Sequence, residues 1–111
     1  MKRGDIVLVE YPFTDTSGSK LRPVLVVSAD EFNSGEDVVI VPLSSQASDP
    51  RFALEVIASA PDFHRTGLRA GSWIKWTKVI TISRTVARRR LGSLPDNSLE
   101  AVLSNIRKLF A

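Results

Sequence analysis

The sequence predicts a mostly-β protein of the α+β class: a small antiparallel β-barrel with a short helix and a C-terminal amphipathic helix. Short apolar segments rich in β-branched residues recur along the chain, and clusters of Gly, Pro, Ser, Thr and Asp separate them. A clear helical spacing of apolar residues appears near the C-terminus. A chain of 111 residues buries roughly two-thirds of its unfolded surface, enough for one hydrophobic core. We therefore predict one domain over residues 1–111.

Three strands are predicted in the first half of the chain. Residues 5–10 (DIVLVE) form the first, and the turn-rich segment 11–20 (YPFTDTSGSK) follows it as a loop. Residues 22–28 (RPVLVVS) carry a proline near their start, where a strand tolerates it, and continue as a buried apolar run. Residues 38–44 (VVIVPLS) form another buried strand, in which Pro42 indicates a sheet edge or a bulge.

Shorter elements are predicted around and after these strands. One helical turn is expected at residues 30–35, and weak alternation favours a fourth strand at 52–57. Residues 58–71 have the composition of a loop and contain the only histidine, His64.

The segment 72–82 (SWIKWTKVITI) alternates between apolar and polar residues, which predicts one continuous strand. One face, with Lys78 as an exception, carries Ile74, Trp76, Ile80 and Ile82. Trp76 is therefore expected in the core. Trp73 shares the opposite face with Lys75.

Two helices are predicted after this strand. Ser83 is placed to cap a short helix that extends to about Arg88. The last helix begins near Pro95–Asp96, because proline is favoured at a helix start. Its apolar residues follow the i, i+3, i+4 spacing and are Leu99, Val102, Leu103, Ile106, Leu109 and Phe110. We expect this stripe to pack on a small sheet.

The charges are distributed unevenly along the chain. Residues 1–50 carry 4 basic and 8 acidic side chains, whereas residues 51–111 carry 11 basic and 4 acidic ones. A pI near 9.7 with the positive charge in one half favours a polyanionic partner. A solvated basic surface without a partner explains the charge alone equally well.

Several function classes are excluded by what the sequence lacks. It contains no cysteine, so disulfides and thiolate chemistry are excluded, in keeping with a reducing compartment. It has neither a signal-peptide pattern nor a long apolar run, so we expect a soluble, cytoplasmic protein. A Walker sequence, an HExxH motif and metal-ligand spacing are absent, so we expect no cofactor and no metal.

Three segments, in this order, resemble the MazF/PemK family of toxin endoribonucleases. Arg3–Asp5 opens a strand (KRGDIVLVEYPFTD), Arg22–Pro23 leads a second (RPVLVVSADEFN), and Val41–Gln46 (VPLSSQ) matches the strand end that carries Pro-Ile-Thr-Ser in the family. The final run, RRRLGSLPDNSLEAVLSNIRKLF, resembles the closing strand and helix of the family. The resemblance extends over nearly the whole chain.

This resemblance implies a fold and an activity. The fold would be an SH3-like barrel that forms a homodimer. The activity would be that of a type II toxin: metal-independent cleavage of single-stranded mRNA through the adjacent 2′-hydroxyl group, inhibited by a cognate, acidic and partly disordered antitoxin.

Two catalytic residues follow from the matched motifs. The essential arginine of the family falls on Arg22, whose planar guanidinium suits a phosphorane. The alternative is a surface arginine in an ordinary ion pair. Ser44 falls where most of the family has threonine, and we assign it a hydrogen bond to the scissile phosphate. The alternative is a hydroxyl that only makes a local hydrogen bond to the backbone at the strand end.

The general base has no assignment. Some family members use a glutamate or histidine in the loop before the Arg-Pro pair, but here the nearest acid is Asp15. The Arg-x-Asp pair of other members corresponds to Lys75 and Thr77, and threonine cannot act as a carboxylate. His64 is a candidate proton shuttle by its ordinary pKa, although a lone loop histidine is more often solvated.

The predicted RNA-binding residues are polar or aromatic and lie on or beside the same strands: Lys20, Gln46, Trp73, Lys75 and Thr77. A second basic group comprises Arg84, Arg88, Arg89 and Arg90. It suits either RNA phosphates or an acidic antitoxin segment, and the sequence does not separate these partners.

Two other functions are compatible with this barrel. Gyrase-poisoning toxins share the fold but depend on a tryptophan near the C-terminus, whereas this chain ends in RKLFA. A barrel that has lost catalysis and only binds RNA or a protein partner is the other alternative, because the carboxylate and histidine of the family are missing.

Overall fold

The computed structural model describes residues 1–11 and 20–111. Its elements run along the chain as β1 (Asp5–Tyr11), β2 (Lys20–Val26), α1 (Asp30–Asn33), β3 (Asp37–Ser44), β4 (Leu54–Val56), the 3₁₀ turn η1 (Phe63–Thr66), β5 (Ser72–Ile74), β6 (Ile80–Ser83), the 3₁₀ turn η2 (Arg84–Val86), β7 (Ala87–Ser93) and α2 (Asp96–Leu109). No helix in this part of the chain is long and apolar enough to cross a membrane.

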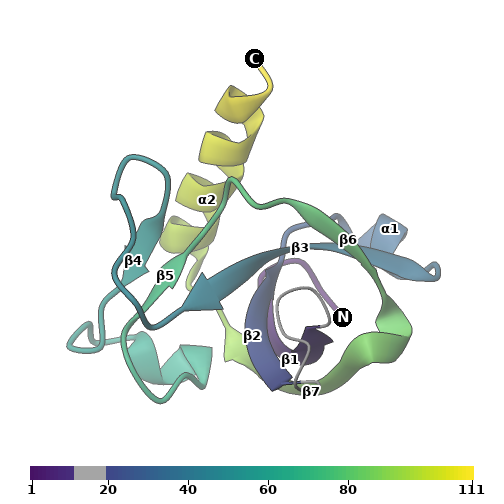
Figure 1. The fold of residues 1–111 in the computed structure, drawn as a ribbon, viewed down its shortest axis with the longest axis horizontal. Helices are drawn as coiled ribbons and strands as arrows, with labels where there is room; N and C mark the ends of the chain where they lie inside the picture. Colours follow the sequence, from purple (N-terminus) through teal and green to yellow (C-terminus); the bar gives the residue numbers. More distant parts are fainter. Residues whose placement is uncertain (12–19) are drawn as a thin grey trace.

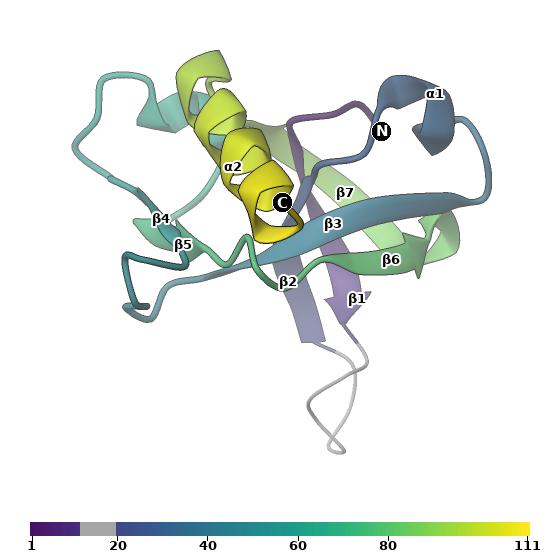
Figure 2. The same ribbon diagram turned by 90° about the horizontal axis from the view of Figure 1, so that it is seen from above.

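The strands form one strongly curved antiparallel sheet (Figure 1). Their order is β4-β5-β3-β2-β1-β7, and β6 also pairs with β3. Figure 2 shows α2 lying across one side of the sheet. The predicted mostly-β fold with a short helix and a C-terminal helix is thus confirmed, although no strand pair in the described residues closes the barrel completely.

Two apolar clusters form the core. The first contains Ile6, Leu25, Val41 and Ile74, and the stripe of α2 packs against it. The second lies on the other face of the same strands and includes Val24, Val26, Val38 and Ile40, each fully buried. Because both faces of the central strands are buried, they have near-continuous apolar sequences.

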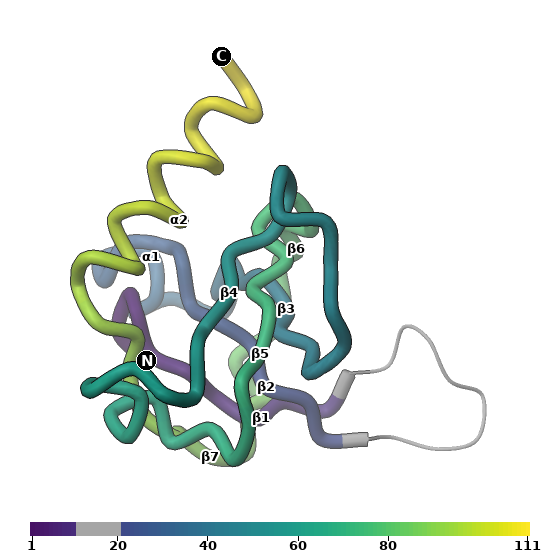
Figure 3. Tube along the Cα trace, turned by 90° about the vertical axis from the view of Figure 1, so that its left-hand side faces the viewer, coloured from purple at the N-terminus to yellow at the C-terminus, as the bar shows by residue number. Residues whose placement is uncertain are grey.

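The C-terminal helix has the predicted start and most of the predicted stripe. Val102 is fully buried, and Leu99, Leu103 and Ile106 pack on the first cluster. The prediction was wrong for Leu109 and Phe110, which are 44% and 74% exposed. Figure 3 shows the reason: the last turn of α2 extends beyond the sheet, so these side chains have no surface to pack on.

Pro42 lies in the interior of the sheet and not at a sheet edge, but it does lie at an irregularity of the ladder, in keeping with the predicted bulge. Strand β3 pairs with β6 from Asp37 to Ile40 and with β5 from Leu43 onward, along the same edge. The Pro42 carbonyl accepts a hydrogen bond from the Lys75 amide at 2.9 Å. The Pro42 nitrogen faces the side of β3 that pairs with β5 and β6, at the junction between these two strands. Proline has no N–H to donate, and no hydrogen bond of the sheet requires one at this position.

The predicted continuous strand at 72–82 was wrong. It is divided into β5 and β6, and Ile40 pairs with Ile80 while Leu43 pairs with Ile74. Ile40 and Leu43 are three residues apart on β3, whereas their partners Ile80 and Ile74 are six residues apart. The extra residues do not pair with β3 and form a turn, in which the Lys78 amide donates to the Lys75 carbonyl at 3.1 Å. The expectation that Trp76 is buried is confirmed, since the residue is 8% exposed.

The other boundary differences are smaller. Ser83 caps a helical turn as predicted, because its Oγ accepts a hydrogen bond from the Thr85 amide at 3.2 Å. That turn ends at Val86 and not near Arg88, since the following residues pair with β1 as strand β7. The strand predicted at 52–57 is limited to Leu54–Val56.

Two glycines allow the segment after η1 to lie directly against β7. A Cβ on Gly67, whose φ is +69°, would overlap the Leu91 carbonyl oxygen, and a Cβ on Gly92 would overlap that of Arg65. Thr66, 1% exposed, adds a hydroxyl that donates to the Phe63 carbonyl at 2.7 Å and accepts from the Leu68 amide at 3.1 Å. These contacts hold the loop before β5 against the sheet.

We predict that Gly92→Ala lowers the free energy of unfolding by roughly 1–3 kcal/mol, because the added methyl group forces the two backbones apart. Urea denaturation monitored by circular dichroism measures the change. Gly35→Ala is the matched control, since its Cβ meets only the Phe32 carbonyl at 3.4 Å. Equal stability of the two variants would contradict this account of the β7 contact.

Candidate functional site

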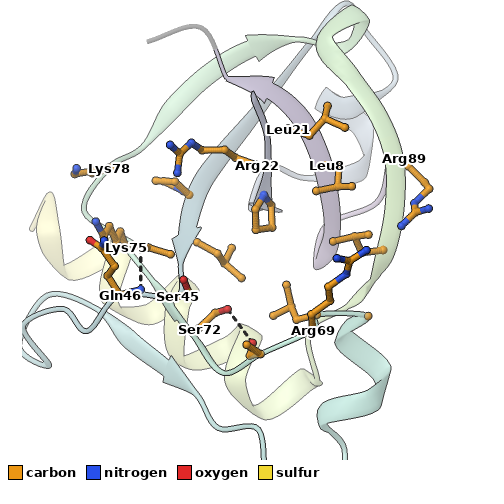
Figure 4. A pocket seen from close by; sticks show the side chains of 18 residues that line it. Leu8, Leu21, Arg22, Ser45, Gln46, Arg69, Ser72, Lys75, Lys78 and Arg89 are labelled. Atoms are coloured by element: carbon orange, nitrogen blue, oxygen red, sulfur yellow. Dashed lines mark hydrogen bonds between the residues drawn. The ribbon is translucent and has the colours of Figure 1, made fainter. Parts of the chain in front are cut away.

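A groove of about 920 Å³ opens where β2 and β3 diverge (Figure 4). The paired positions of these strands end at Val24 and Pro42, so the preceding part of β2 and the last residues of β3 separate. Strands β1 and β7 and the loop before β5 complete the walls. The lining residues are Leu8, Leu21, Arg22, Pro23, Pro42, Leu43, Ser44, Ser45, Gln46, Gly67, Leu68, Arg69, Ala70, Ser72, Lys75, Lys78, Arg89 and Leu91.

The groove combines apolar residues with positive charge. Leu8, Pro23 and Leu43 come from adjacent strands, and Leu8 and Pro23 are cross-strand partners. Five of the lining residues are cationic: Arg22, Arg69, Lys75, Lys78 and Arg89. None of the described lining residues is acidic. Such a groove fits a polyanion that also presents flat apolar surfaces.

Arg22 and Ser44 both line this groove. Val24 pairs with Pro42, so Arg22 and Ser44 each lie two residues beyond that pair, in corresponding positions on strands that are diverging. Arg22 is exposed and Ser44 is half-buried. The Ser44 Oγ accepts a hydrogen bond from the Gln46 amide at 3.2 Å, which leaves its proton available as a donor toward the groove.

The structure brings two of the predicted RNA-binding residues to the same groove. Lys75 lines it, and its backbone is held to β3 by the bond to the Pro42 carbonyl. Gln46 lines it from the segment that follows β3. Lys20 begins β2, but its side chain and all of Asp15 lie outside the described residues.

Three other predicted residues lie outside the groove. Trp73 is half-buried in β5 and pairs with Ser44 and Glu55, but it is not a lining residue. Thr77 is in the turn between β5 and β6. His64 is exposed on η1 and is not a lining residue, although its carbonyl accepts a hydrogen bond from the amide of Gly67, which is one. In each case the sequence indicated the side-chain chemistry, but the direction of the side chain depends on the local turn.

The arginine group at 84–90 is divided among several surfaces. Arg84 donates to the Gly35 carbonyl at 3.1 Å. Arg88 pairs with Glu10 at 2.7 Å, and Arg90 pairs with Asp5 at 3.0 Å. Arg89 alone among these four lines the groove. The four arginines therefore do not form one continuous basic surface, because neighbouring residues on a strand point in different directions.

Residues 2–110 match the sequence profile of the PemK-like, MazF-like toxins of type II toxin–antitoxin systems. The chain belongs to this family. It is also 30% identical over 99 residues to a probable endoribonuclease MazF of Mycolicibacterium smegmatis, a match that covers 89% of this chain and 86% of the relative.

Solved structures of MazF-like toxins have the same fold as this family member. A MazE–MazF crystal structure from Deinococcus radiodurans superposes with a TM-score of 0.79 at 20% identity, covering 99% of this chain and 95% of that chain. The Mycobacterium tuberculosis toxin MazF-mt6 superposes with a TM-score of 0.74 at 21% identity, covering 96% and 95%.

Acid–base groups are scarce in the groove of this MazF-like chain. Among the described lining residues there is no carboxylate and no imidazole. Asp49, in the segment between β3 and β4, has a lowered pKa because its carboxylate accepts hydrogen bonds from the Arg51 side chain and amide. It is therefore ionised at neutral pH, and it is bound to Arg51 outside the lining. In the described ranges 1–11 and 20–111, no three His, Cys, Asp or Glu side chains are grouped as metal ligands would be.

Three cations of the groove were missed as site residues at the level of sequence: Arg69, Lys78 and Arg89. Lys78 had a signal, since it interrupts an apolar face of the alternating segment. Arg89 was one of four similar arginines, and Arg69 lies in an irregular loop. No periodicity indicates the direction of a side chain in a loop, so Arg69 had no sequence signal.

Proposed function

We propose that this MazF-like toxin is an endoribonuclease that cleaves single-stranded mRNA without a metal ion. Three observations support the proposal: the family membership, the relative named as a probable endoribonuclease, and the groove. The single observation that carries the chemistry is that Arg22 and Ser44 line one cationic groove. A cytoplasmic location fits an mRNA substrate.

The proposed reaction uses the substrate's own nucleophile. The 2′-oxygen attacks the adjacent phosphorus and loses its proton, and the bond from phosphorus to the 5′-oxygen breaks. The leaving oxygen takes up a proton, so the products are a 2′,3′-cyclic phosphate and a 5′-hydroxyl. The protein has to stabilise the charge on the pentavalent phosphorus and to assist two proton transfers.

Arg22 is proposed to stabilise the phosphorane, because its fork of N–H donors matches two phosphate oxygens. Its position on β2 is fixed by pairing with Val9 of β1. Ser44 is proposed to donate a hydrogen bond to the scissile phosphate, with its orientation set by the Gln46 amide. Because no described lining residue is a carboxylate or an imidazole, the 2′ proton is proposed to pass to a solvent water molecule, and water returns a proton to the 5′-oxygen.

We predict that the purified protein cuts single-stranded RNA in excess EDTA and that two substitutions impair it. Arg22→Ala should reduce kcat/KM by roughly 100-fold or more, as loss of a charged transition-state donor does. Ser44→Ala should reduce it about 10-fold, the effect of one hydrogen bond. Gel analysis of labelled oligonucleotides measures both effects, and end-group analysis identifies the cyclic phosphate.

Matched controls are available on distant surfaces. Arg107 pairs with Glu100 on α2 at 3.4 Å, and the Ser34 hydroxyl donates to the Glu31 carbonyl at 2.7 Å. Arg107→Ala and Ser34→Ala should cut RNA like the wild type. Intact RNA after incubation with wild-type protein would contradict the nuclease proposal, loss of cleavage in EDTA would contradict metal independence, and full activity of both groove variants would contradict the site.

A homodimer is proposed for this chain, as the family resemblance implies. Supporting it are Leu109 and Phe110, which leave apolar surface exposed at the end of α2. Light scattering at micromolar concentration should give about twice the chain mass of 12.2 kDa. A mass of one chain under these conditions would contradict the dimer.

An acidic, partly disordered antitoxin is the proposed protein partner. The excess of basic side chains in residues 51–111 supports this partner, and a similar structure from Deinococcus radiodurans was solved as MazE–MazF. A neighbouring gene that encodes a small acidic protein, and loss of RNA cleavage when that protein is added, are the expected results.

A further inference from the structure

The three consecutive arginines of β7 have different surroundings. Arg88 binds Glu10 with its Nε at 2.9 Å and its Nη2 at 2.7 Å, and Arg90 binds Asp5 with its Nε at 3.0 Å. Both therefore have carboxylate partners on β1. Arg89, between them, contributes to the groove instead, and no hydrogen bond to another described residue engages its side chain.

Irregular pairing gives Arg89 this direction. Strand β7 shifts its register against β1 between Ile6 and Val7 and again between Leu8 and Val9. Arg89, paired with Leu8, lies in the short paired stretch between the two shifts. Register shifts of this kind change the direction of nearby side chains. As a result Arg89 and Leu8 line the same groove.

Arg69 joins Arg89 on the same wall. In Figure 4 both side chains lie on one side of the pocket, and Lys75, Lys78 and Gln46 lie on the other. The backbone around Arg69 is held against β7 by the close approaches at Gly67 and Gly92. A loop arginine is ordinarily free to sample many positions, but this one starts from a backbone that is packed on the sheet.

The backbones that carry the two walls are separated by the width of strand β1. Arg89 pairs with Leu8, and Leu8 pairs with Pro23, the neighbour of Arg22. The backbones of Arg89 and Pro23 are therefore two strand spacings apart, roughly 10 Å. Between them lie the apolar side chains of Leu8 and Pro23, which offer a surface for a base or a ribose.

We propose that Arg69 and Arg89 form a second phosphate subsite, which binds the RNA backbone at a phosphate other than the scissile one. The inference rests on the nuclease function proposed above and adds a substrate-binding site to it. Arg22 and Ser44 act at the bond that breaks, whereas Arg69 and Arg89 hold the strand across the apolar floor. Their contribution is to substrate binding, because the proposed reaction assigns the scissile phosphate to Arg22 and Ser44.

An RNA phosphate fits this wall better than an acidic peptide does. The pair of guanidiniums lies in one groove with Arg22 and Ser44, so an extended chain that places a phosphodiester at those residues continues directly to the other wall. The intervening floor is apolar and suits the flat face of a base. The carboxylate side chains of an acidic peptide would not cover this apolar floor.

We predict that Arg69→Gln and Arg89→Gln each raise KM for RNA about 5- to 10-fold and leave kcat unchanged. The effect should disappear for the shortest oligonucleotide that wild-type protein cuts, because it does not reach the second subsite. Binding of an uncleavable 2′-O-methyl oligonucleotide, measured by fluorescence anisotropy, should lose about 0.7 from its logarithmic salt slope per phosphate contact removed.

Arg88→Gln is the matched control, since it removes the neighbouring arginine of the same strand but leaves the groove unchanged. It should retain the wild-type KM and salt slope. Thermal melting of every variant verifies that the fold is intact, and Arg89→Lys should keep the salt slope while losing part of the affinity, because lysine retains the charge without the fork.

The outcomes separate this inference from the nuclease proposal. If wild-type protein cleaves RNA and both glutamine variants keep the wild-type KM for oligonucleotides of every length, the second subsite is overturned and the nuclease proposal is unaffected. No cleavage by wild-type protein, with a reduced salt slope in the variants, would overturn the nuclease and leave the subsite. Unchanged RNA binding with weakened binding of polyglutamate would overturn the phosphate subsite in favour of an acidic peptide.

Discussion

Strand β3 has two partners along one edge, β6 and then β5, and Pro42 occupies the junction between them. Because proline lacks an N–H, it can occupy the junction without leaving a donor unpaired. On the opposite edge, pairing with β2 ends at the same residue. The divergence of β2 from β3 at this point creates the groove, and it brings Arg22 and Ser44 to its walls. The proposed roles of Arg22 and Ser44 depend on this point of the sheet.

Charge is the second constraint on the site. Arg88 and Arg90 are neutralised by Glu10 and Asp5, whereas the described groove residues include cations without acids. The formal charge of +3 therefore understates the local field in the groove. A groove that collects cations raises the local concentration of a polyanion and orients it. In the proposed reaction the positive charge of Arg22 is in place before the transition state forms, so stabilisation by it requires no reorganisation of the protein.

Two departures from the family pattern bear on activity. Ser44 keeps the hydroxyl expected of threonine but lacks the methyl group that restrains its rotamer. The hydrogen bond from the Gln46 amide replaces part of that restraint. The described lining also lacks a carboxylate or imidazole that would take the 2′ proton. Activity in this chain would accordingly rest more on electrostatic stabilisation and positioning than on general base catalysis.

The sequence by itself determined the strands β1 to β3, the capped turn at Ser83 and the start of α2, because local periodicity and capping chemistry specify such elements. The motif around Arg22 and Ser44 indicated the family as well. Only the tertiary structure decided where the chain leaves the ladder between Ile74 and Ile80, and which arginine of β7 lines the groove. Both depend on pairing with strands that are distant in sequence. Alternation along one segment contains no information on a partner's register, so Arg69 and Arg89 could be recognised only after β1, β7 and the loop before β5 had come together.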